Sequence, residues 1–261
     1  MKTILLNVAR ALVAAGCLLL SLAVQADKVT IAAAADLKFA MDGIVTAFKQ
    51  AHPGDEVDVI YGSSGKFHTQ IQQGAPYDLF FSADINFPRQ LAKNGFASSD
   101  VRPYGLGRLV LWSTKLDATK MTLASLTDPN ITRIAIANPK HAPYGKRAEE
   151  ALRASGLWEK IEPKLVYGEN IAHTAQFVQT GNAQVGIIAL ALAISPELAG
   201  QGGYGLIPDQ LHEPLEQGFI ITRHAASNTL AKRFAEYMST PAARTRMTQY
   251  GFVLPGDAAR K

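Results

Sequence analysis

The chain has 261 residues and a formal net charge of +4, and its length suits one large domain or two modest ones. Basic and acidic residues are interspersed without a basic block, so the charge pattern gives no support to nucleic-acid binding. The single cysteine, Cys17, lies in the apolar N-terminal stretch, and removal of that stretch would exclude disulfide and thiol chemistry.

The first 26 residues have the features of a secretory signal peptide. A short basic start precedes Ala11–Val24, which is almost wholly apolar, and small residues then lead to Ala26. We expect cleavage after Ala26 and no membrane insertion of the mature chain, because the apolar run is too short for a comfortable span. An uncleaved anchor and lipidation at Cys17 are the alternatives.

Strands alternate with helices along the rest of the chain. Short apolar runs predict strands, and apolar residues at helical spacing predict helices. The expected strands are 29–33, 57–60, 78–82, 108–112, 133–137, 165–167, 184–188 and 218–222. The expected helices are 37–48, one beginning at Ser64, 88–93, 144–154, 171–180, 228–238 and one beginning at Thr240-Pro241. This rhythm predicts an α/β architecture with helices on both sheet faces, in which ligands bind beyond the carboxyl ends of the strands.

Four turns that follow expected strands are rich in small and polar residues. They are Ala33–Leu37, Tyr61–Lys66, Ala137–Gly145 and Tyr167–Ile171. In the third turn Pro143 fixes its φ angle at a helix start, and in the fourth Asn170 is a candidate N-cap. The start of a helix offers unpaired N–H groups and the positive end of the helix dipole, and serine or tyrosine adds an O–H donor. Ordinary capping is the alternative for any single turn, but four such turns together favour a shared anion site.

The same residues give little support to an enzyme. The six histidines form no zinc-binding pair, and a P-loop would need serine or threonine where Phe67 stands. Ser64 and His68 are one helical turn apart, yet no nucleophile elbow surrounds them. We therefore expect no catalysis, no prosthetic group and no metal cofactor. A ferric-iron-binding protein is a further alternative, although no adjacent tyrosine pair supports it.

Several blocks, in a characteristic order, resemble the periplasmic molybdate-binding proteins of ABC transporters, which are type II periplasmic binding proteins. The similarity extends over nearly the whole mature chain. Its blocks are Ala32–Leu37, Gly62–Gly65, Gln73–Phe80, Ser82–Asp84, Asn138–Gly145, Glu169–Ile171 and Gln184–Ile188. The resemblance, and not composition or periodicity, implies that the anion is molybdate.

The resemblance also implies a fold of two α/β lobes, each a mixed, mostly parallel sheet flanked by helices. Two crossing strands would join the lobes and act as the hinge. Mapped onto this chain, residues 27–109 with 218–261 would form the first lobe, and residues 110–217 the second. The ligand would lie in the cleft between them.

Six residues match the anion-binding positions of the family. In the first lobe they are Ala35, Asp36, Ser63 and Ser64, and in the second lobe Tyr144 and the backbone N–H of Ile171. Tyr144 would supply a hydroxyl that comes, in some relatives, from another position. We expect a ligand held by neutral donors, with no countercharge and no direct cation ligand.

Asp36 departs from the family pattern, because relatives carry serine or asparagine there. An ionised aspartate only accepts hydrogen bonds and would repel a dianion. Three hypotheses stay open: the carboxylate caps its own helix while its N–H faces the ligand, the carboxyl is protonated when the anion binds, or the specificity has shifted.

The implied partners are molybdate, with tungstate beside it, and a membrane ABC permease. The expected location is the periplasm, and the expected state is a monomer. Sulfate or thiosulfate is the alternative ligand within the same class, and ferric iron is a more distant one.

Overall fold

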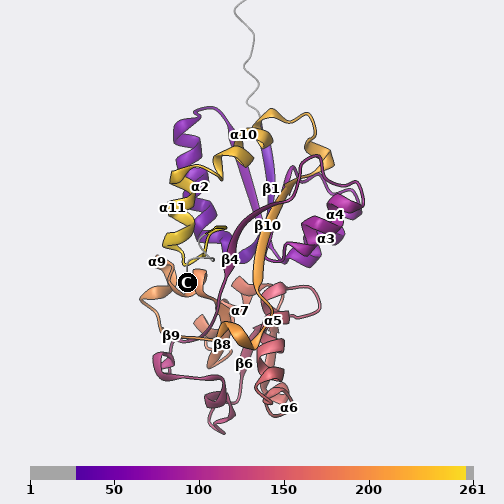
Figure 1. The fold of residues 1–261 in the computed structure, drawn as a ribbon. Helices are drawn as coiled ribbons and strands as arrows, with labels where there is room; N and C mark the ends of the chain where they lie inside the picture. Colours follow the sequence, from indigo (N-terminus) through magenta and orange to yellow (C-terminus); the bar gives the residue numbers. More distant parts are fainter. Residues whose placement is uncertain (1–27, 257–261) are drawn as a thin grey trace, which may run out of the picture.

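The computed structural model describes residues 28–256 and contains two lobes, each built around a β-sheet of five strands (Figure 1). The predicted signal peptide and its cleavage site after Ala26 lie outside the described residues. Within residues 28–256, no helix is both long and apolar enough to cross a bilayer.

Lobe 1 has the strand order β2-β1-β3-β10-β4. In that order the strands are β2 (Glu56–Gly62), β1 (Lys28–Ala34), β3 (Leu79–Ser82), β10 (Leu215–Ile221) and β4 (Arg102–Gly107). Its helices are η1 (Ala35–Leu37), α2 (Lys38–Ala51), α3 (Ser64–Gln72), α4 (Asn86–Lys93), η6 (Arg223–Ala225), α10 (Thr229–Tyr237) and α11 (Pro241–Gln249). The β1–β2 and β1–β3 pairs are parallel, whereas β10 is antiparallel to both of its neighbours.

Lobe 2 has the strand order β7-β6-β8-β5-β9. In that order the strands are β7 (Leu165–Gly168), β6 (Ile134–Ala137), β8 (Val185–Ala189), β5 (Leu109–Ser113) and β9 (Gly203–Leu206). Its helices are η2 (Ala118–Lys120), η3 (Leu123–Thr127), α5 (Pro143–Ala154), α6 (Trp158–Ile161), η4 (Glu162–Lys164), α7 (Ile171–Gln179), α8 (Leu190–Ala193), α9 (Pro196–Ala199) and η5 (Asp209–Leu211). Here β6 runs parallel to β7 and β8, and β5 is antiparallel to β8 and β9.

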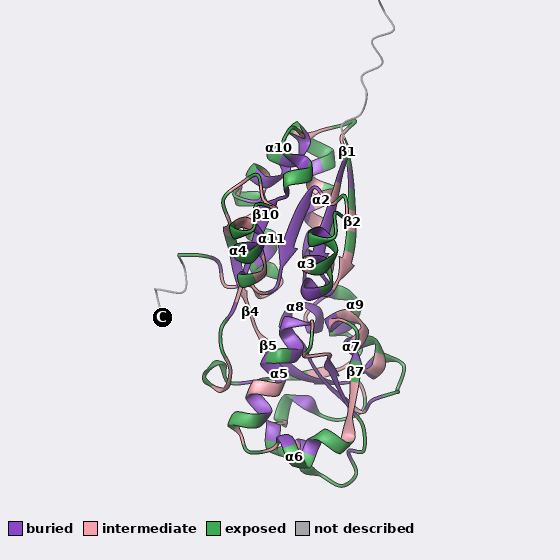
Figure 2. Ribbon diagram, turned by 90° about the vertical axis from the view of Figure 1, so that its right-hand side faces the viewer, coloured by how far each residue is buried: buried purple, intermediate pink, exposed green. Residues whose placement is uncertain are grey.

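Helices cover both faces of the lobe 1 sheet. Along β1, Ile31 and Ala33 pack in one cluster with α2, α10 and α11, whereas Ala32 packs in another with α3 and α4. Successive side chains of a strand point to opposite faces, so both faces of this strand are buried and its sequence is apolar throughout. Figure 2 shows buried residues along the strands of both sheets and exposed residues on the outer sides of the helices.

The predicted α/β architecture of mixed sheets flanked by helices is confirmed, but two strands escaped prediction. Strands β4 and β9 contain glycines, and β4 also contains Pro103, which are turn signals in a sequence. Each lies at the edge of its sheet, and an edge strand tolerates proline because one side of it needs no ladder hydrogen bonds. Hydrogen bonding to the neighbouring strands therefore makes β4 and β9 strands although their own sequences do not indicate it.

The chain passes between the lobes twice, at Arg108 between β4 and β5 and again between β9 and β10. Residues near both ends of the sequence therefore share lobe 1, with α11 packed beside α2 (Figure 1). The predicted lobe limits, 27–109 with 218–261 and 110–217, stay predictions at the level of single residues.

Parallel pairing brings the four predicted turns together in two pairs. In lobe 1 the last residues of β1 and β2, Ala34 and Gly62, lie side by side, so the turns into η1 and α3 are neighbours. In lobe 2 the last residues of β6 and β7, Ala137 and Gly168, do the same, and the turns into α5 and α7 are neighbours. Both pairs lie at the carboxyl edge of a sheet, where α/β proteins bind ligands.

Candidate functional site

A small cavity of about 10 Å³ lies between the two lobes, and all six predicted anion-binding residues line it. We call it the interlobe cavity. Its lining consists of Ala34, Ala35, Asp36, Gly62, Ser63, Ser64, Ala83, Ala142, Pro143, Tyr144, Asn170 and Ile171. This volume is near the minimum that one water molecule needs, so the lobes are closed around the site and a larger ligand needs them to separate.

Lobe 1 contributes the start of α3 and the residues of η1. Ser63 precedes α3, and Ser64 is the first residue of the helix. The Ser64 Oγ accepts a hydrogen bond of 3.0 Å from the Ala83 N–H, which fixes the side chain and leaves the hydroxyl proton to be donated. Ser64 is therefore held in place as a donor beside the cavity.

Lobe 2 contributes the first turns of α5 and α7. Pro143 is the first residue of α5, as predicted, and Tyr144 follows it. Asn170 caps α7 as predicted, because its side-chain oxygen accepts from the His173 N–H at 2.9 Å. Ile171 then begins α7, where its own N–H has no carbonyl four residues back within the helix.

Neutral donors dominate this arrangement. Three helices begin at the cavity with the positive ends of their dipoles, and the described residues that line it include no lysine, arginine or histidine. Asp36 is the one carboxylate in the lining. The chemistry suits a compact anion, except at Asp36.

Asp36 joins the two lobes through a buried hydrogen-bond network. Its Oδ2 accepts from the Tyr144 hydroxyl at 3.0 Å and from the Gln217 Nε2 at 2.8 Å. The Gln217 amide also donates to the Tyr144 oxygen at 3.1 Å and accepts from the Tyr104 hydroxyl at 2.7 Å. The idea that the Asp36 carboxylate caps its own helix stays a hypothesis, because the N–H groups of Asp36 and Leu37 lie close enough to lower the pKa of the carboxyl. The carboxylate accepts from Tyr144 across the cleft and from Gln217 on β10 of its own lobe.

Burial controls the ionisation of this network. Burial raises the pKa of Asp36 from its ordinary 3.8 to about 6, although hydrogen bonds from Gln217 and Tyr144 lower it. Burial and then the Asp36 charge raise the pKa of the Tyr144 hydroxyl well above its ordinary 10.0, so that it remains a donor. In this arrangement the Tyr144 hydroxyl donates its single proton in a hydrogen bond to Asp36.

Three contacts close the cleft beside the cavity. The Ser63 hydroxyl donates to the His141 backbone oxygen at 2.5 Å, and its oxygen lies 2.9 Å from the Nδ1 of the same residue. The Gly65 N–H donates to the same backbone oxygen at 2.9 Å. The Lys66 ammonium forms an exposed ion pair of 3.0 Å with Glu169. The Ser63 proton therefore points to the other lobe, and Ser64 is the serine with a proton to offer.

Sequence reasoning missed Gln217, which is fully buried at a β-bulge in β10. The one local signal is an amide directly before the apolar run of Gly218–Ile221, and nothing nearby in the sequence indicates its partners. His141 lies within the predicted turn Ala137–Gly145, and nothing nearby in the sequence indicates its partners either. Its bonds to Ser63 and Gly65 arise because the two lobes meet, which no local pattern records.

The residues considered for catalysis and metal binding do not assemble into such a site. Ser64 bonds the Ala83 N–H, and His68 packs against the Phe87 ring with centroids 5.1 Å apart. The His173 Nδ1 accepts from the Glu169 N–H at 3.3 Å. Across residues 28–256, no three His, Cys, Asp or Glu side chains gather in a way that could hold a metal ion.

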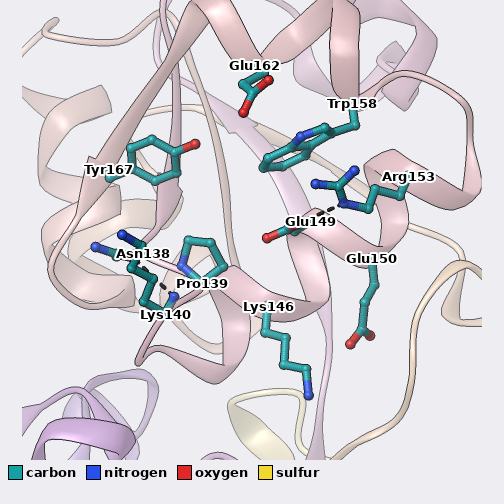
Figure 3. Close-up of a pocket in the computed structure, with 10 residues that line it drawn as sticks. All are labelled: Asn138, Pro139, Lys140, Lys146, Glu149, Glu150, Arg153, Trp158, Glu162 and Tyr167. Carbon is teal, nitrogen blue, oxygen red and sulfur yellow. Dashed lines mark hydrogen bonds and ion pairs between the residues drawn. The ribbon is translucent and has the colours of Figure 1, made fainter.

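A larger cavity of about 710 Å³ opens on lobe 2, and none of the six predicted anion-binding residues lines it (Figure 3). Its lining carries as many acidic side chains, Glu149, Glu150 and Glu162, as basic ones, Lys140, Lys146 and Arg153. Arg153 bonds Glu149 at 2.8 Å and lies over the Trp158 ring, so its charge is already engaged. Size alone favours this cavity as a ligand site, but its formal charges cancel and give no net attraction for an anion.

Comparison with known proteins shows the family to which this chain belongs. Residues 29–253 match the family described as bacterial extracellular solute-binding protein. The molybdate-binding protein ModA of Azotobacter vinelandii is 37% identical over 95% of this chain and 98% of its own length. ModA of Escherichia coli (strain K12) is 31% identical over 87% and 89% of the two chains. The solved Azotobacter vinelandii periplasmic molybdate-binding protein superposes with a TM-score of 0.82 at 31% identity, covering 87% of this chain and 99% of that one. The chain belongs to the bacterial extracellular solute-binding protein family, and within it to the periplasmic molybdate-binding proteins.

Proposed function

We propose that this chain captures molybdate in the interlobe cavity and delivers it to an ABC permease. The observation that carries the proposal is a cavity at the carboxyl ends of two sheets, lined by helix starts and the Ser64 hydroxyl and free of side-chain cations. A fully deprotonated oxyanion needs donors, whereas phosphate handling normally calls on arginine clamps or metals. Tungstate has the same charge and is expected to bind at the same place.

Binding would proceed by closure of the lobes around the anion. We assign the hydrogen-bond donors to the backbone and side chains of Ser64 and Tyr144 and to the backbone N–H of Ile171. Ala35, Asp36 and Ser63 complete the predicted part of the cavity lining. Hydrogen bonds to a charged group contribute about 1.5–3 kcal/mol each, so several of them suit dissociation constants of roughly micromolar to nanomolar. The chain would bind and release its cargo as a monomer and catalyse no reaction.

Export through the predicted signal peptide would place the mature chain in the periplasm, with Asp27 as its first residue. An intact mass that matches cleavage after Ala26 would support this, and a mass that retains residues 1–26 or carries a lipid would contradict it.

The function is tested by thermal unfolding of the purified mature chain with molybdate, tungstate, sulfate, phosphate and ferric iron. A ligand that binds the folded state raises the melting temperature in proportion to the logarithm of its concentration over its dissociation constant. We expect molybdate and tungstate to raise it most. Stabilisation by sulfate or iron without stabilisation by molybdate would overturn the proposal.

Replacing Ser64 by alanine is expected to weaken molybdate binding. The change removes the hydroxyl proton that the Ala83 N–H leaves available, and the loss of one bond to a charged ligand, about 1.5–3 kcal/mol, weakens binding roughly 10- to 150-fold. Isothermal titration measures it. Ser155→Ala is the matched control, because the Ser155 hydroxyl bonds Ala151 at the far end of α5, away from the cavity. Equal affinities of the two variants would contradict the role of Ser64.

Replacing Glu169 by glutamine is expected to change molybdate affinity by less than about fivefold. The Lys66–Glu169 pair joins the lobes, but both side chains are about half exposed, and solvent-exposed pairs contribute roughly 0–1 kcal/mol. Titration at low and high salt measures the effect. A loss of more than about tenfold would mean that this ion pair, and not the buried contacts, holds the cleft closed.

A further inference from the structure

We propose that this chain takes up one proton together with each molybdate dianion that it binds, and that the Asp36 carboxyl holds that proton. The inference rests on the proposed function and assigns to Asp36 a role in specificity that a serine or asparagine at this position could not have. It comes from the hydrogen bonds around Asp36 and from the number of protons that they contain.

The position of Asp36 makes an ionised carboxylate incompatible with a bound dianion. The residue is 1% exposed and lines the interlobe cavity. Its Oδ2 accepts from Tyr144 and Gln217, and its Oδ1 is buried without a hydrogen-bond partner. A dianion in the same small cavity would place like charges together where little water screens them.

The groups that face Asp36 are uncharged. They are Tyr144 on α5, Gln217 on β10 and, beyond the glutamine, Tyr104 on β4. The nearby cations pair elsewhere: Arg147 on α5 bonds Glu150 at 2.6 Å and lies 3.9 Å from Asp84, and Lys66 bonds Glu169. His141 contacts Ser63, and burial followed by the Lys66 charge lowers its pKa. Protonation is therefore the remaining way to remove the charge of Asp36 from the cavity.

The number of protons in the network explains why binding would require one more proton. With Asp36 ionised, the hydroxyl proton of Tyr144 is donated to Oδ2, and the same proton cannot also be donated to the ligand. A proton from solvent, bound to the Asp36 carboxyl, lets the carboxyl donate to the Tyr144 oxygen. The Tyr144 hydroxyl then turns its own proton to the anion. No covalent bond other than the new O–H forms or breaks, and the net charge of the loaded site falls from three negative charges to two.

The pKa of Asp36 in the unliganded chain suits the uptake of a proton on binding. Burial already raises the pKa of Asp36 to about 6, and a neighbouring dianion would raise it further. At a pH above the pKa of the free site, the carboxyl starts ionised and ends protonated. Binding then consumes one proton, and affinity falls about tenfold for each unit of pH increase until the pKa of the loaded site is reached.

Isothermal titration of the mature chain with sodium molybdate tests this directly. Titrations at one pH, in buffers with different enthalpies of ionisation, report the protons taken up from the difference in heat. We expect an uptake near one proton for the wild type, and a dissociation constant that rises about tenfold between about pH 7 and about pH 8. The measurement needs no variant, so it stands even if a substitution at Asp36 impairs folding.

The variant Asp36→Asn tests whether Asp36 is the residue that holds the proton. The amide keeps an acceptor and adds a donor, so we expect buffer-independent heat, a flat pH profile and tighter binding than the wild type at about pH 8. Asp42→Asn is the control, since Asp42 lies on α2 and its carboxylate bonds Lys38 outside the cavity. It is expected to keep the full proton uptake.

Three outcomes would overturn the inference. In the first, the binding heat of the wild type is independent of the buffer and its affinity does not change with pH. In the second, Asp36→Asn takes up as many protons as the wild type. In the third, Asp42→Asn loses the proton uptake. Failure of the proposed function looks different, because the wild type would then give no molybdate heat in any buffer, and the inference would be refuted with it.

Discussion

Replacing Gly65 by alanine is expected to weaken molybdate binding about 10- to 100-fold without destabilising the unliganded chain. A Cβ at this position would lie 2.5 Å from the His141 backbone oxygen and 3.0 Å from its Cα, across the cleft. Backbone atoms of the opposing lobe cannot shift as a flexible side chain does, so the closed arrangement meets an overpacking cost of about 1–3 kcal/mol. Each 1.4 kcal/mol corresponds to about tenfold in affinity.

The expected loss of affinity arises because Gly65→Ala hinders closure of the lobes. The substitution should therefore lower the affinity without lowering the stability of the unliganded chain. Gly65 lies in the first turn of α3, where alanine is intrinsically better for the helix by up to about 1 kcal/mol. Thermal unfolding without ligand should match or exceed the wild type, while titration shows weaker binding. Gly200→Ala is the matched control, because nothing lies within 4 Å of a Cβ there. Wild-type affinity in Gly65→Ala would show that the lobes do not approach this closely in the loaded state.

Replacing Asp36 by asparagine is expected to stabilise the unliganded chain at neutral pH by about 3 kcal/mol. The folded-state pKa of about 6 exceeds the ordinary value of 3.8, so between these values the folded chain binds the proton more strongly than the unfolded chain does. A shift of roughly two pKa units corresponds to about 3 kcal/mol. The contribution of protonated Asp36 to stability is fully present below about pH 4 and is lost as the pH rises through about 6.

Urea unfolding of both chains across this pH range measures the effect. The difference in unfolding free energy between Asp36→Asn and wild type should be near zero at about pH 4, grow up to about pH 6 and stay constant above it. Asp42→Asn is again the control, since the Asp42 side chain on α2 is about half exposed and lies outside the interlobe cavity. A wild type more stable than Asp36→Asn at neutral pH would contradict the cost of burying this carboxylate.

Asp36 is a carboxylate at a position where the family resemblance implies a neutral donor. The Oδ2 of the buried carboxylate accepts from the Tyr144 hydroxyl and the Gln217 amide, and both come from distant parts of the chain. A buried charge without a countercharge lowers stability, and in our proposal it would link closure to protonation. Sites at which local rules fail are often functional sites, and here the failure falls in the lining of the interlobe cavity.

Apart from β4, β9 and several short helices, the sequence by itself determined the order of the helices and strands and the chemistry of the turns between them. The cap at Asn170, the first turn at Pro143 and the helix start at Ser64 depend on residues within one turn of each other, so local patterns were enough to predict them. The strand ends that bring these turns together follow from parallel pairing in an α/β sheet.

Only the tertiary structure decided which polar groups meet inside the cavity. Asp36 lies 108 residues from Tyr144 and 181 residues from Gln217, and a hydrogen bond over such a separation has no local signature. The same holds for the contact of Gly65 with His141, and for β4, whose Pro103 is acceptable because the strand lies at a sheet edge. Local preferences act through neighbours along the chain, whereas burial, like-charge repulsion and closure depend on which distant segments fold against each other.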